Sequence, residues 1–461
     1  MESAPIIMAS DPSNGVALPR PALATAALHA DHPDHATDAN YAVAPSISLS
    51  TTFRAPHPNS AHAKLLEQVG KGEAEFDMQD PDFHIYSRYS QSTNIRCEKV
   101  LSQIMKAHAL TYSSGLSAAH AAVAYYAPSV IAIKRGYHGV HVSIQLWCRG
   151  RNVKIIDLDD DYEAAVGAVN TSSDSKEEVV QRGGLLVWVE TPLNPSGEAR
   201  DLAKYVRKAK AVPGAHVVVD STFAPPPLQN PFQQGADMVM HSGTKYFGGH
   251  SDLLCGVLAV QDKREWDSLW ADRTYFGSNL GSMEAYLLLR SLRTLTVRVQ
   301  KQSATATKLA SWLHSLASPS PSTPVSAEDE AFAGAKLIAR TYHSSLQPRS
   351  DLDDVVTKGS TPEDPTFDPS AQMPGGHAPT FAFRTTKPVY ATFIPHLTTY
   401  FTPATSLGGV ESLLEHRVKS DPTEDPRIIR VSVGLEEFDD LQADLRAAFK
   451  AVLEKESQGQ L

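Results

Sequence analysis

Cysteine is scarce in this chain of 461 residues, which carries only Cys97, Cys148 and Cys255. Three widely separated cysteines are too few for the disulfide framework of a small secreted protein or for a structural zinc site. The scarcity favours a reducing compartment, and we therefore expect a cytoplasmic protein.

Basic charge is also low. The chain has 42 Lys and Arg against 52 Asp and Glu, a formal net charge of -10 at pH 7. Because nucleic acids and anionic membrane surfaces attract basic patches, we expect neither as a partner. The N-terminal stretch MESAPIIMASDPSNG lacks a basic region and a sustained apolar run, so we expect neither a secretory signal nor a transit peptide.

Long apolar runs are missing as well. The most apolar long window, from Leu116 to Ile133, is interrupted by His120 and Pro128, whereas a membrane-spanning helix needs about 20 apolar residues. The composition is otherwise globular, with 42% hydrophobic and 20% charged residues. This composition excludes a mostly disordered chain, and the length allows two or three domains of roughly 150 residues each.

The central part of the chain predicts an α/β sheet. Short, continuous, β-branched runs are typical of parallel strands buried on both faces, and helical patterns such as 160–169 and 202–211 lie between them. The strand-like runs are 129–134, 153–158, 185–190, 216–220 and 237–242. Alternation of strands and helices implies a mostly parallel sheet with right-handed crossovers.

The flanking segments differ in composition from this centre. Residues 1–60 are rich in Ala, Pro, Ser and His and predict an extended arm, followed by a large domain at 61–300 and a C-terminal domain at 301–461. Within the last domain, 317–332 and 347–370 are rich in Pro, Ser and acidic residues and predict surface insertions.

Histidines in the arm provide the one candidate for a metal site. His29, His32 and His35 alternate with Asp31 and Asp34, but no pair of them lies on a predicted helix or strand. We therefore expect a turn-rich loop and no bound metal.

Polar side chains stand at the ends of three strand-like runs. Asn194, Asp220 and Lys245 each lie at or just after the carboxyl end of such a run. Ligands of open α/β sheets bind outside the carboxyl ends of the strands, so we expect these three side chains to share one crevice.

Pyridoxal phosphate is a ligand that fits this set. A partly buried lysine such as Lys245 loses its proton readily and can form a Schiff base with an aldehyde. Asp220 can keep a pyridine nitrogen protonated, and the hydroxyls of Ser242 and Thr244 suit a phosphate. Singly, such a lysine is usually solvated and such an aspartate usually caps a helix; their joint occurrence points to the cofactor.

Two further segments fit the same cofactor. In TYSSGLSAAHAA, the backbone N–H groups of Gly115 and Leu116 at a helix start can cradle a phosphate. Tyr137 follows a strand-like run and can stack on a pyridine ring, the alternative being an ordinary half-buried tyrosine.

The segment 217–252, VVVDSTFAPPPLQNPFQQGADMVMHSGTKYFGGHSD, resembles the signature of the Cys/Met-metabolism pyridoxal-phosphate enzymes, which include cystathionine lyases and synthases. Further segments resemble the same family in chain order: YSRYSQST, SSGLSAA, ETPLNP, LRSLRTLTVR, QMPGGHAPTFAF, ATSLGGVESL and RIIRVSVGLEEFDDLQADL. The resemblance implies the aspartate-aminotransferase-like fold (fold type I), with a mostly parallel sheet in the large domain and a smaller α+β C-terminal domain.

The resemblance also implies roles at the cofactor. Lys245 is similar to the lysine that binds the cofactor covalently and later shuttles protons, and Asp220 to the partner of the pyridine nitrogen. Tyr137 resembles the stacking tyrosine, which also assists proton transfer. The residues that resemble the phosphate cradle are Gly115, Leu116, Ser242 and Thr244.

Other matched positions concern the substrate and a second subunit. Arg430 resembles the arginine that binds the α-carboxylate of the amino acid, with Ser406 beside it and Asn194 near the cofactor. Tyr86 and Arg88 resemble the pair that reaches the phosphate of the neighbouring subunit's cofactor. This implies a homo-oligomer with shared active sites, usually a homotetramer built as a dimer of dimers.

The chain departs from the family pattern at several positions. Gln91 and Ser92 replace a usual Asn-Pro, and Leu116 stands where Met is common. Thr405 stands where many cystathionine γ-lyases and γ-synthases carry Glu, which weakens the case for recognition of cystathionine's distal amino group. The usual MTH stretch is replaced by EHRVKSDPTEDP at 415–426.

We expect an enzyme of sulfur amino-acid metabolism that cleaves C–S bonds of cystathionine-type small molecules by β/γ-elimination. The first alternative is γ-replacement on an O-acylhomoserine, as in cystathionine γ-synthases. A non-catalytic binding protein on the same scaffold is the alternative of another class, and it has no need of Lys245, Asp220 and Arg430 together. A dehydrogenase is disfavoured because no GxGxxG follows a first strand.

Overall fold

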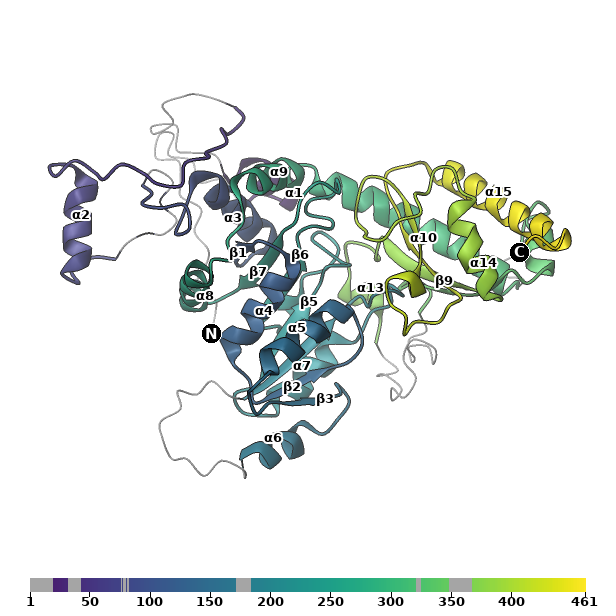
Figure 1. Ribbon diagram of the computed structural model, residues 1–461, viewed down its shortest axis with the longest axis horizontal. Helices are drawn as coiled ribbons and strands as arrows, with labels where there is room; N and C mark the ends of the chain where they lie inside the picture. The colour runs from purple at the N-terminus through teal and green to yellow at the C-terminus, as the bar shows by residue number, and fades with distance from the viewer. Residues whose placement is uncertain are drawn as a thin grey trace.

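Two β-sheets organise the protein, as seen in a computed structural model that describes residues 20–31, 43–75, 77, 80, 83–170, 184–320, 325–347 and 367–461. A seven-stranded sheet forms the core of the larger part, and a four-stranded sheet forms that of the smaller C-terminal part. The long helix α10 (Leu295–Ala317) runs from the larger part into the smaller one (Figure 1).

The seven-stranded sheet has the order β1-β7-β6-β5-β4-β2-β3. Strands β6, β5, β4, β2 and β3 pair in parallel, whereas β7 is antiparallel to both β6 and β1. The strands are β1 His108–Tyr112, β2 Val130–Ile133, β3 Lys154–Ile156, β4 Leu185–Glu190, β5 His216–Asp220, β6 Met238–Ser242 and β7 Gly256–Val260. The mostly parallel sheet is confirmed, while β1 and β7 lie outside the predicted runs.

Helices cover both faces of this sheet. Alternate residues of β4 enter two separate cores: Val187 and Val189 join one, and Leu186 and Trp188 join the other. Burial on both faces explains why the strand is apolar without alternation. One face carries α1 Leu23–His29, α3 Ser92–Met105, α6 Tyr162–Asn170, α7 Leu202–Lys210 and α9 Ser282–Leu292. The other carries α4 Gly115–Tyr126, α5 His138–Cys148 and α8 Lys263–Phe276.

The four-stranded sheet is antiparallel throughout, in the order β10-β11-β9-β8. Its strands are β8 Ile338–Tyr342, β9 Thr380–Thr385, β10 Leu413–His416 and β11 Ile428–Ser432. Side chains from β9 and β11 pack with α10, α14 (Pro388–Phe393) and α15 (Phe438–Ser457) in one core (Figure 1). Short elements complete the fold: η1 Pro231–Gln234, α11 Glu330–Gly334, α13 Pro369–Gln372, η2 Ile394–His396 and η3 Arg417–Lys419.

The N-terminal segment is not extended throughout, contrary to the prediction for 1–60. An alanine-rich run forms α1, and its Ala26 and Ala27 are buried, because small side chains let the helix pack closely on α3 and α10. Helix α2 (Ala61–Gly70) buries no residue and stands away from the body of the molecule (Figure 1).

The histidines of the arm are only partly described. His29 is the last residue of α1, and His32 and His35 lie outside the described residues. Among the residues that the structure describes, no group of three His, Cys, Asp or Glu could hold a metal ion. Nor is any described helix long and apolar enough to cross a membrane.

The predicted insertion at 317–332 is partly wrong, because its second half is packed. The buried Asp329 carboxylate accepts a hydrogen bond from the Trp312 indole at 3.0 Å and two from Arg446 at 2.7 and 2.8 Å. These charge-assisted bonds hold the segment against α10 and α15. Of the other insertion, 347–370, residues 348–366 lie outside the described part of the chain.

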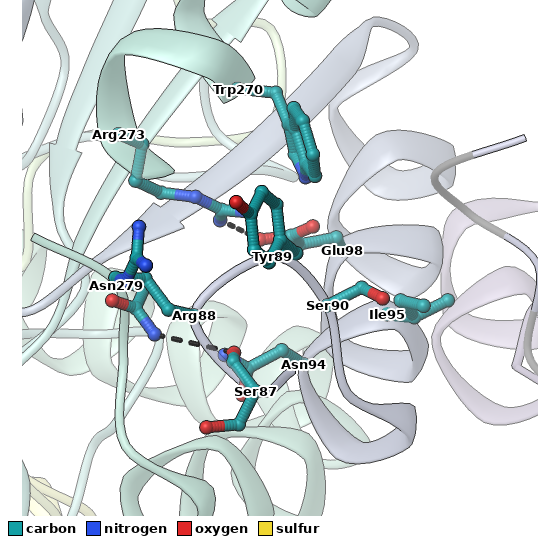
Figure 2. A pocket seen from close by; sticks show the side chains of 10 residues that line it. All are labelled: Ser87, Arg88, Tyr89, Ser90, Asn94, Ile95, Glu98, Trp270, Arg273 and Asn279. Carbon is teal, nitrogen blue, oxygen red and sulfur yellow. Dashed lines mark hydrogen bonds and ion pairs between the residues drawn. The ribbon is translucent and has the colours of Figure 1, made fainter. Parts of the chain in front are cut away.

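Glu98 and Arg273 form a buried ion pair that connects α3 and α8 to β1 (Figure 2). The Glu98 carboxylate also accepts hydrogen bonds from the backbone N–H and the hydroxyl of Thr111 at 3.0 and 2.7 Å. Arg273 donates to the Thr111 carbonyl at 2.9 Å. The two side chains are only 4% and 3% exposed, so water cannot replace either partner.

We expect Glu98→Gln to lower the free energy of unfolding by about 3 kcal/mol, because it leaves the buried Arg273 charge without a counter-charge. Urea denaturation followed by tryptophan fluorescence measures the loss. The control is Asp267→Asn, which breaks an exposed pair with Lys263 and should cost less than about 1 kcal/mol. Equal losses in the two variants would contradict a stabilising role for the buried pair.

Candidate active site

A cavity of about 530 Å³ lies at the carboxyl ends of β4, β5 and β6, where segments of both parts of the protein meet. The strand ends supply polar side chains, as expected for a parallel sheet. Ten of the residues predicted for the site line this cavity: Gly115, Leu116, Tyr137, Asn194, Asp220, Ser242, Thr244, Lys245, Ser406 and Arg430.

Lys245 lies three residues beyond the end of β6. Its Nζ donates a hydrogen bond to the Ser406 hydroxyl at 3.0 Å, which joins the large sheet to the C-terminal part. Burial, and after it the positive charge of Arg430, lowers the pKa of Lys245 to about 8. Its amine is therefore neutral in a far larger fraction of molecules near neutral pH than that of a solvated lysine.

Asp220 is the last residue of β5 and is 5% exposed. Its Oδ1 accepts hydrogen bonds from the backbone N–H of Thr222 at 3.0 Å and from the Thr222 hydroxyl at 2.5 Å. Burial raises the pKa of Asp220 to about 6. The carboxylate is thus held in one orientation at the cavity wall, and a positive charge beside it would favour its ionised form.

Glu190, which the sequence analysis did not single out, lies next to Asp220. It ends β4 and is the register partner of Asp220 in β5. Its two carboxyl oxygens accept hydrogen bonds from the backbone N–H groups of Tyr137, at 2.7 Å, and of Asn194, at 2.8 Å. Glu190 therefore positions two of the predicted residues. The only signal in the sequence was an acidic residue at the end of a buried strand.

The space around Glu190 is tight. Gly136 has φ +92°, and a Cβ at this position would lie 2.3 Å from Glu190 Oε2, so glycine is required there for two reasons. Burial, and next the negative charge of Asp220, raises the pKa of Glu190 to about 8. Two adjacent buried carboxyls thus share this wall of the cavity, and Glu190 is the one more readily protonated.

The first turn of α4 also lines the cavity. Gly115 begins this helix, and a Cβ there would lie 3.0 Å from the Cβ of Ser242, so the helix start approaches β6 closely. The Thr244 hydroxyl accepts a hydrogen bond from the Cys255 N–H at 3.0 Å, which fixes the following turn. Backbone N–H groups at a helix start, together with nearby hydroxyls, suit an anion such as phosphate.

Arg430, on β11, is 4% exposed and fixed from several sides. Its guanidinium donates to Asn194 Oδ1 at 3.1 Å and to the Ser406 carbonyl at 2.8 Å, and it pairs with Glu415 Oε2 at 2.5 Å. Ser406 has φ +85°, a strained conformation for a residue other than glycine. The strained turn presents its hydroxyl to Lys245 and its carbonyl to Arg430.

Two predicted residues, Tyr86 and Arg88, do not line the cavity of their own chain. Arg88 instead donates to the Thr274 carbonyl at 3.1 Å and lies over the rings of Tyr86 and Tyr89, 5.5 and 5.2 Å from their centroids. Arg88 lies on the loop before α3, and Figure 2 shows it beside Asn279. Tyr86 is 40% exposed, which leaves it available to another molecule.

The sequence is similar to that of a known protein family. The model described as "Cys/Met metabolism PLP-dependent enzyme" matches residues 24–320 and 354–450. The chloroplastic cystathionine β-lyase of Arabidopsis thaliana is 31% identical over 58% of this chain, a match that spans about half (52%) of that protein.

Other similar proteins align over most of their length. Cystathionine γ-lyase of Saccharomyces cerevisiae is 28% identical, covering 93% of this chain and 97% of that protein. Cystathionine γ-synthase of Escherichia coli is 29% identical, covering 81% and 89%. The crystal structure of metB from Corynebacterium glutamicum superposes with a TM-score of 0.72 at 25% identity, covering 94% of this chain and 98% of that one.

The lowered pKa of Lys245 gives a prediction for cofactor-free protein. Only the neutral amine attacks an aldehyde, so the rate of Schiff-base formation with pyridoxal phosphate should rise with pH and reach half its maximum near pH 8. Stopped-flow absorbance measures this rate. Arg430→Gln should move the midpoint to higher pH, and a midpoint near the ordinary lysine value of about 10.4 in the wild type would contradict the assignment.

Glu190 provides a second prediction. In Glu190→Gln an amide NH₂ replaces one of the two carboxyl oxygens, so one of the two backbone N–H groups loses its acceptor. The lost hydrogen bond lowers the free energy that orders the cavity wall by about 1.4 kcal/mol. We expect the affinity for pyridoxal phosphate, measured by fluorescence titration, to fall about tenfold. Glu67→Gln on the exposed helix α2 is the control and should leave the affinity for pyridoxal phosphate unchanged. Equal affinities in both variants would show that Glu190 does not position the wall.

Proposed function

The chain belongs to the Cys/Met metabolism PLP-dependent enzyme family, and on this premise we propose that it cleaves C–S bonds of cystathionine-type amino acids by β- or γ-elimination. The observation that carries the proposal is the placement of Lys245, with its lowered pKa, in one cavity with Asp220 and the buried Arg430. An amino-acid substrate needs a carboxylate anchor and a base in that same space.

The residues around the cavity fit pyridoxal phosphate. We assign the amine of Lys245 to its aldehyde, Asp220 to its ring nitrogen and Tyr137 to stacking on the ring. The start of α4, with Ser242 and Thr244, is assigned to the phosphate. When bound, the cofactor supplies an electron sink that stabilises negative charge at the α carbon of the substrate.

Arg430 is assigned to the α-carboxylate of the substrate. Its donation to Asn194 and to the Ser406 carbonyl fixes the plane of the guanidinium, so little side-chain entropy remains to be lost on binding. A carboxylate held there lies beside Lys245, because the Ser406 turn contacts both side chains.

Lys245 is assigned to proton transfer. Once the amino group of the substrate has taken its place at the aldehyde, the released neutral amine would remove the proton from the α carbon, and the Ser406 hydroxyl, 3.0 Å from Nζ, would orient it. Loss of a group from the γ carbon needs a second deprotonation at the β carbon, and the flexible lysine side chain can reach both positions.

The second candidate is γ-replacement on an O-acylhomoserine. Thr405 lines the cavity at a position where many cystathionine γ-lyases and γ-synthases carry Glu. A threonine offers no negative charge to a distal ammonium, whereas an O-acyl substrate has no distal ammonium to recognise. This observation favours γ-replacement in which neither the O-acylhomoserine nor the nucleophile brings a distal ammonium, and it leaves the assignments of Lys245 and Arg430 unchanged.

We also propose a homo-oligomer, a dimer of dimers in which Tyr86 and Arg88 complete the cavity of a neighbouring subunit. These two side chains lie outside their own cavity, and the surrounding segment exposes Leu49 and Ile85 at 74% and 50%. Exposed apolar side chains of this kind are typical of interfaces. The three free cysteines favour a reducing, cytoplasmic location.

Incubation of the purified protein with cystathionine tests the function. We expect release of a keto acid and a thiol without an added nucleophile. Lys245→Ala should reduce the rate by at least about 10³-fold and remove the visible absorption band of the wild type, because no other lysine lines the cavity among the described residues. Turnover of an O-acylhomoserine with a thiol, and none of cystathionine, would reject the lyase in favour of the second candidate.

A further inference from the structure

The turn at the end of helix α8 lies between two segments that we assign to cofactor phosphates. Helix α8 ends at Phe276, and Gly277, with φ +68°, caps it by donating its N–H to the Arg273 carbonyl. The N–H of Ser278 donates to the same carbonyl at 3.2 Å. We call residues 273–279 the α8 turn. Its backbone conformation depends on a glycine at a positive φ.

The α8 turn holds the start of the proposed phosphate cradle in its own chain. The Ser278 carbonyl accepts a hydrogen bond from the backbone N–H of Ser113 at 2.9 Å. The next residue, Ser114, is the N-cap of α4, and its hydroxyl accepts a hydrogen bond from the Ser117 N–H at 3.1 Å. The helix then begins at Gly115. The position of the α8 turn therefore sets where the first turn of α4 starts.

The same turn also holds Arg88. The Nη1 of Arg88 donates to the carbonyl of Thr274, a buried residue, at 3.1 Å. Figure 2 shows Arg88, Asn279 and Arg273 around a small cavity of about 10 Å³, which has room for about one water molecule. Arg88 thus packs closely on the turn, and its direction depends on the conformation of the turn.

The buried side chain of Arg273 connects the turn to strand β1. It donates to the Thr111 carbonyl at 2.9 Å and forms the ion pair with Glu98. The Glu98 carboxylate in turn accepts hydrogen bonds from the N–H and the hydroxyl of Thr111. Because Thr111 precedes Ser113 by two residues, the end of β1, the α8 turn and the start of α4 are held as one unit.

The outer side of the α8 turn is apolar. Tyr275 and Phe276 are exposed, and so are Ile85 and Tyr86 of the segment that carries Arg88. Aromatic side chains are enriched at protein interfaces. The turn and the neighbouring segment therefore suit contact with a second copy of the chain, as proposed above for Tyr86 and Arg88.

We infer that the α8 turn positions the phosphate-binding groups of two cofactor sites, namely the start of α4 in its own subunit and Arg88, which serves a neighbouring subunit. This inference rests on the proposed function, because it takes the start of α4 as the phosphate site and Arg88 as a group that acts across an interface. Arg273 and Gly277 are positioning residues, since neither lines the cavity. An altered turn should therefore weaken phosphate binding in both subunits.

Cofactor titrations of the full-length, cofactor-free protein test the role of the turn. Pyridoxal has the ring and the aldehyde of pyridoxal phosphate but no phosphate, and the visible absorption band that either aldehyde forms with Lys245 measures its affinity. Gly277→Val places a β-branched residue at φ +68°, where a Cβ would have open space, so the substitution strains mainly the backbone of the turn. We expect the affinity for pyridoxal phosphate to fall at least about tenfold and that for pyridoxal to stay unchanged.

Gly459→Val is the matched control. Gly459 follows α15 in the C-terminal part with φ +67°, and a Cβ there would also have open space (Figure 1). It contacts neither phosphate-binding segment, so we expect both affinities to stay unchanged. If Gly277→Val weakens the binding of both aldehydes equally, or of neither, the positioning role is overturned.

Mixed assemblies test the contribution to the neighbouring subunit. Wild-type and Lys245→Ala subunits are co-expressed with two affinity tags, and the visible band then reports only the wild-type sites. When the Lys245→Ala subunits also carry Gly277→Val, the turn behind the neighbour's Arg88 is altered, whereas the turn of the wild-type subunit is intact. We expect a population of wild-type sites with about tenfold weaker binding of pyridoxal phosphate in this second assembly alone. Identical titrations of the two assemblies would overturn the inference.

The outcomes distinguish this inference from the function on which it rests. If the wild type forms no visible band with pyridoxal phosphate, the proposed function fails and the inference with it. A monomeric wild type that still forms the band overturns the inference alone. If circular dichroism shows that Gly277→Val does not fold, Gly277→Ala, which is less strained at the same φ, decides the question. It should show a smaller loss for pyridoxal phosphate and none for pyridoxal, and the absence of this difference would overturn the inference.

Discussion

The active-site cavity depends on contacts between two sheets that fold around separate hydrophobic cores. Lys245 follows a strand of the large sheet, but its amine donates to Ser406 of the C-terminal part. In the other direction, Arg430 donates to Asn194, which follows a strand of the large sheet. Lys245 and Arg430, which we propose as the base and the carboxylate anchor, are therefore held together only when the two parts are docked.

Close packing of backbone keeps this docking rigid. A Cβ at Gly408, which has φ +80°, would lie 2.8 Å from the backbone nitrogen of Tyr246, the residue after Lys245. Buried Arg298 of α10 donates to the Tyr246 carbonyl at 2.9 Å, so the helix that joins the two parts also holds the lysine turn. Such an arrangement limits the motion of the reacting groups to their side chains.

Burial of charged groups sets the electrostatics of the cavity. The carboxyls at the ends of β4 and β5 have raised pKa values, and Lys245 and Arg430 have lowered ones, so each group is shifted toward its neutral form. A group with opposite charge restores the charged form, whereas proton transfer uses the neutral one. The same desolvation therefore favours both ligand binding and base catalysis.

Much of this site could be predicted from the sequence, because strand ends in a parallel sheet converge whatever the details of the loops. The runs 185–190 and 216–220 have the bounds of β4 and β5, and the run 237–242 differs from β6 by one residue. Asp220 ends β5 and Lys245 follows β6, so both follow from these runs. The family, the fold type and the cofactor are confirmed by the comparisons. Glu190 was missed because its role depends on the Tyr137 backbone, 53 residues away in sequence. Helix α1 and the buried Asp329 depend on tertiary packing in the same way.

The groups assigned to the cofactor and the short helix η3 are constrained to different degrees. The groups assigned to the cofactor are held between the two sheets, so a substitution there disturbs the docking as well as the chemistry. The short helix η3 follows an edge strand of the small sheet and enters the cavity from that side alone. Glu415 precedes η3 and pairs with Arg430, so the charge of Arg417 in η3 is electrostatically coupled to the position that we assign to the α-carboxylate.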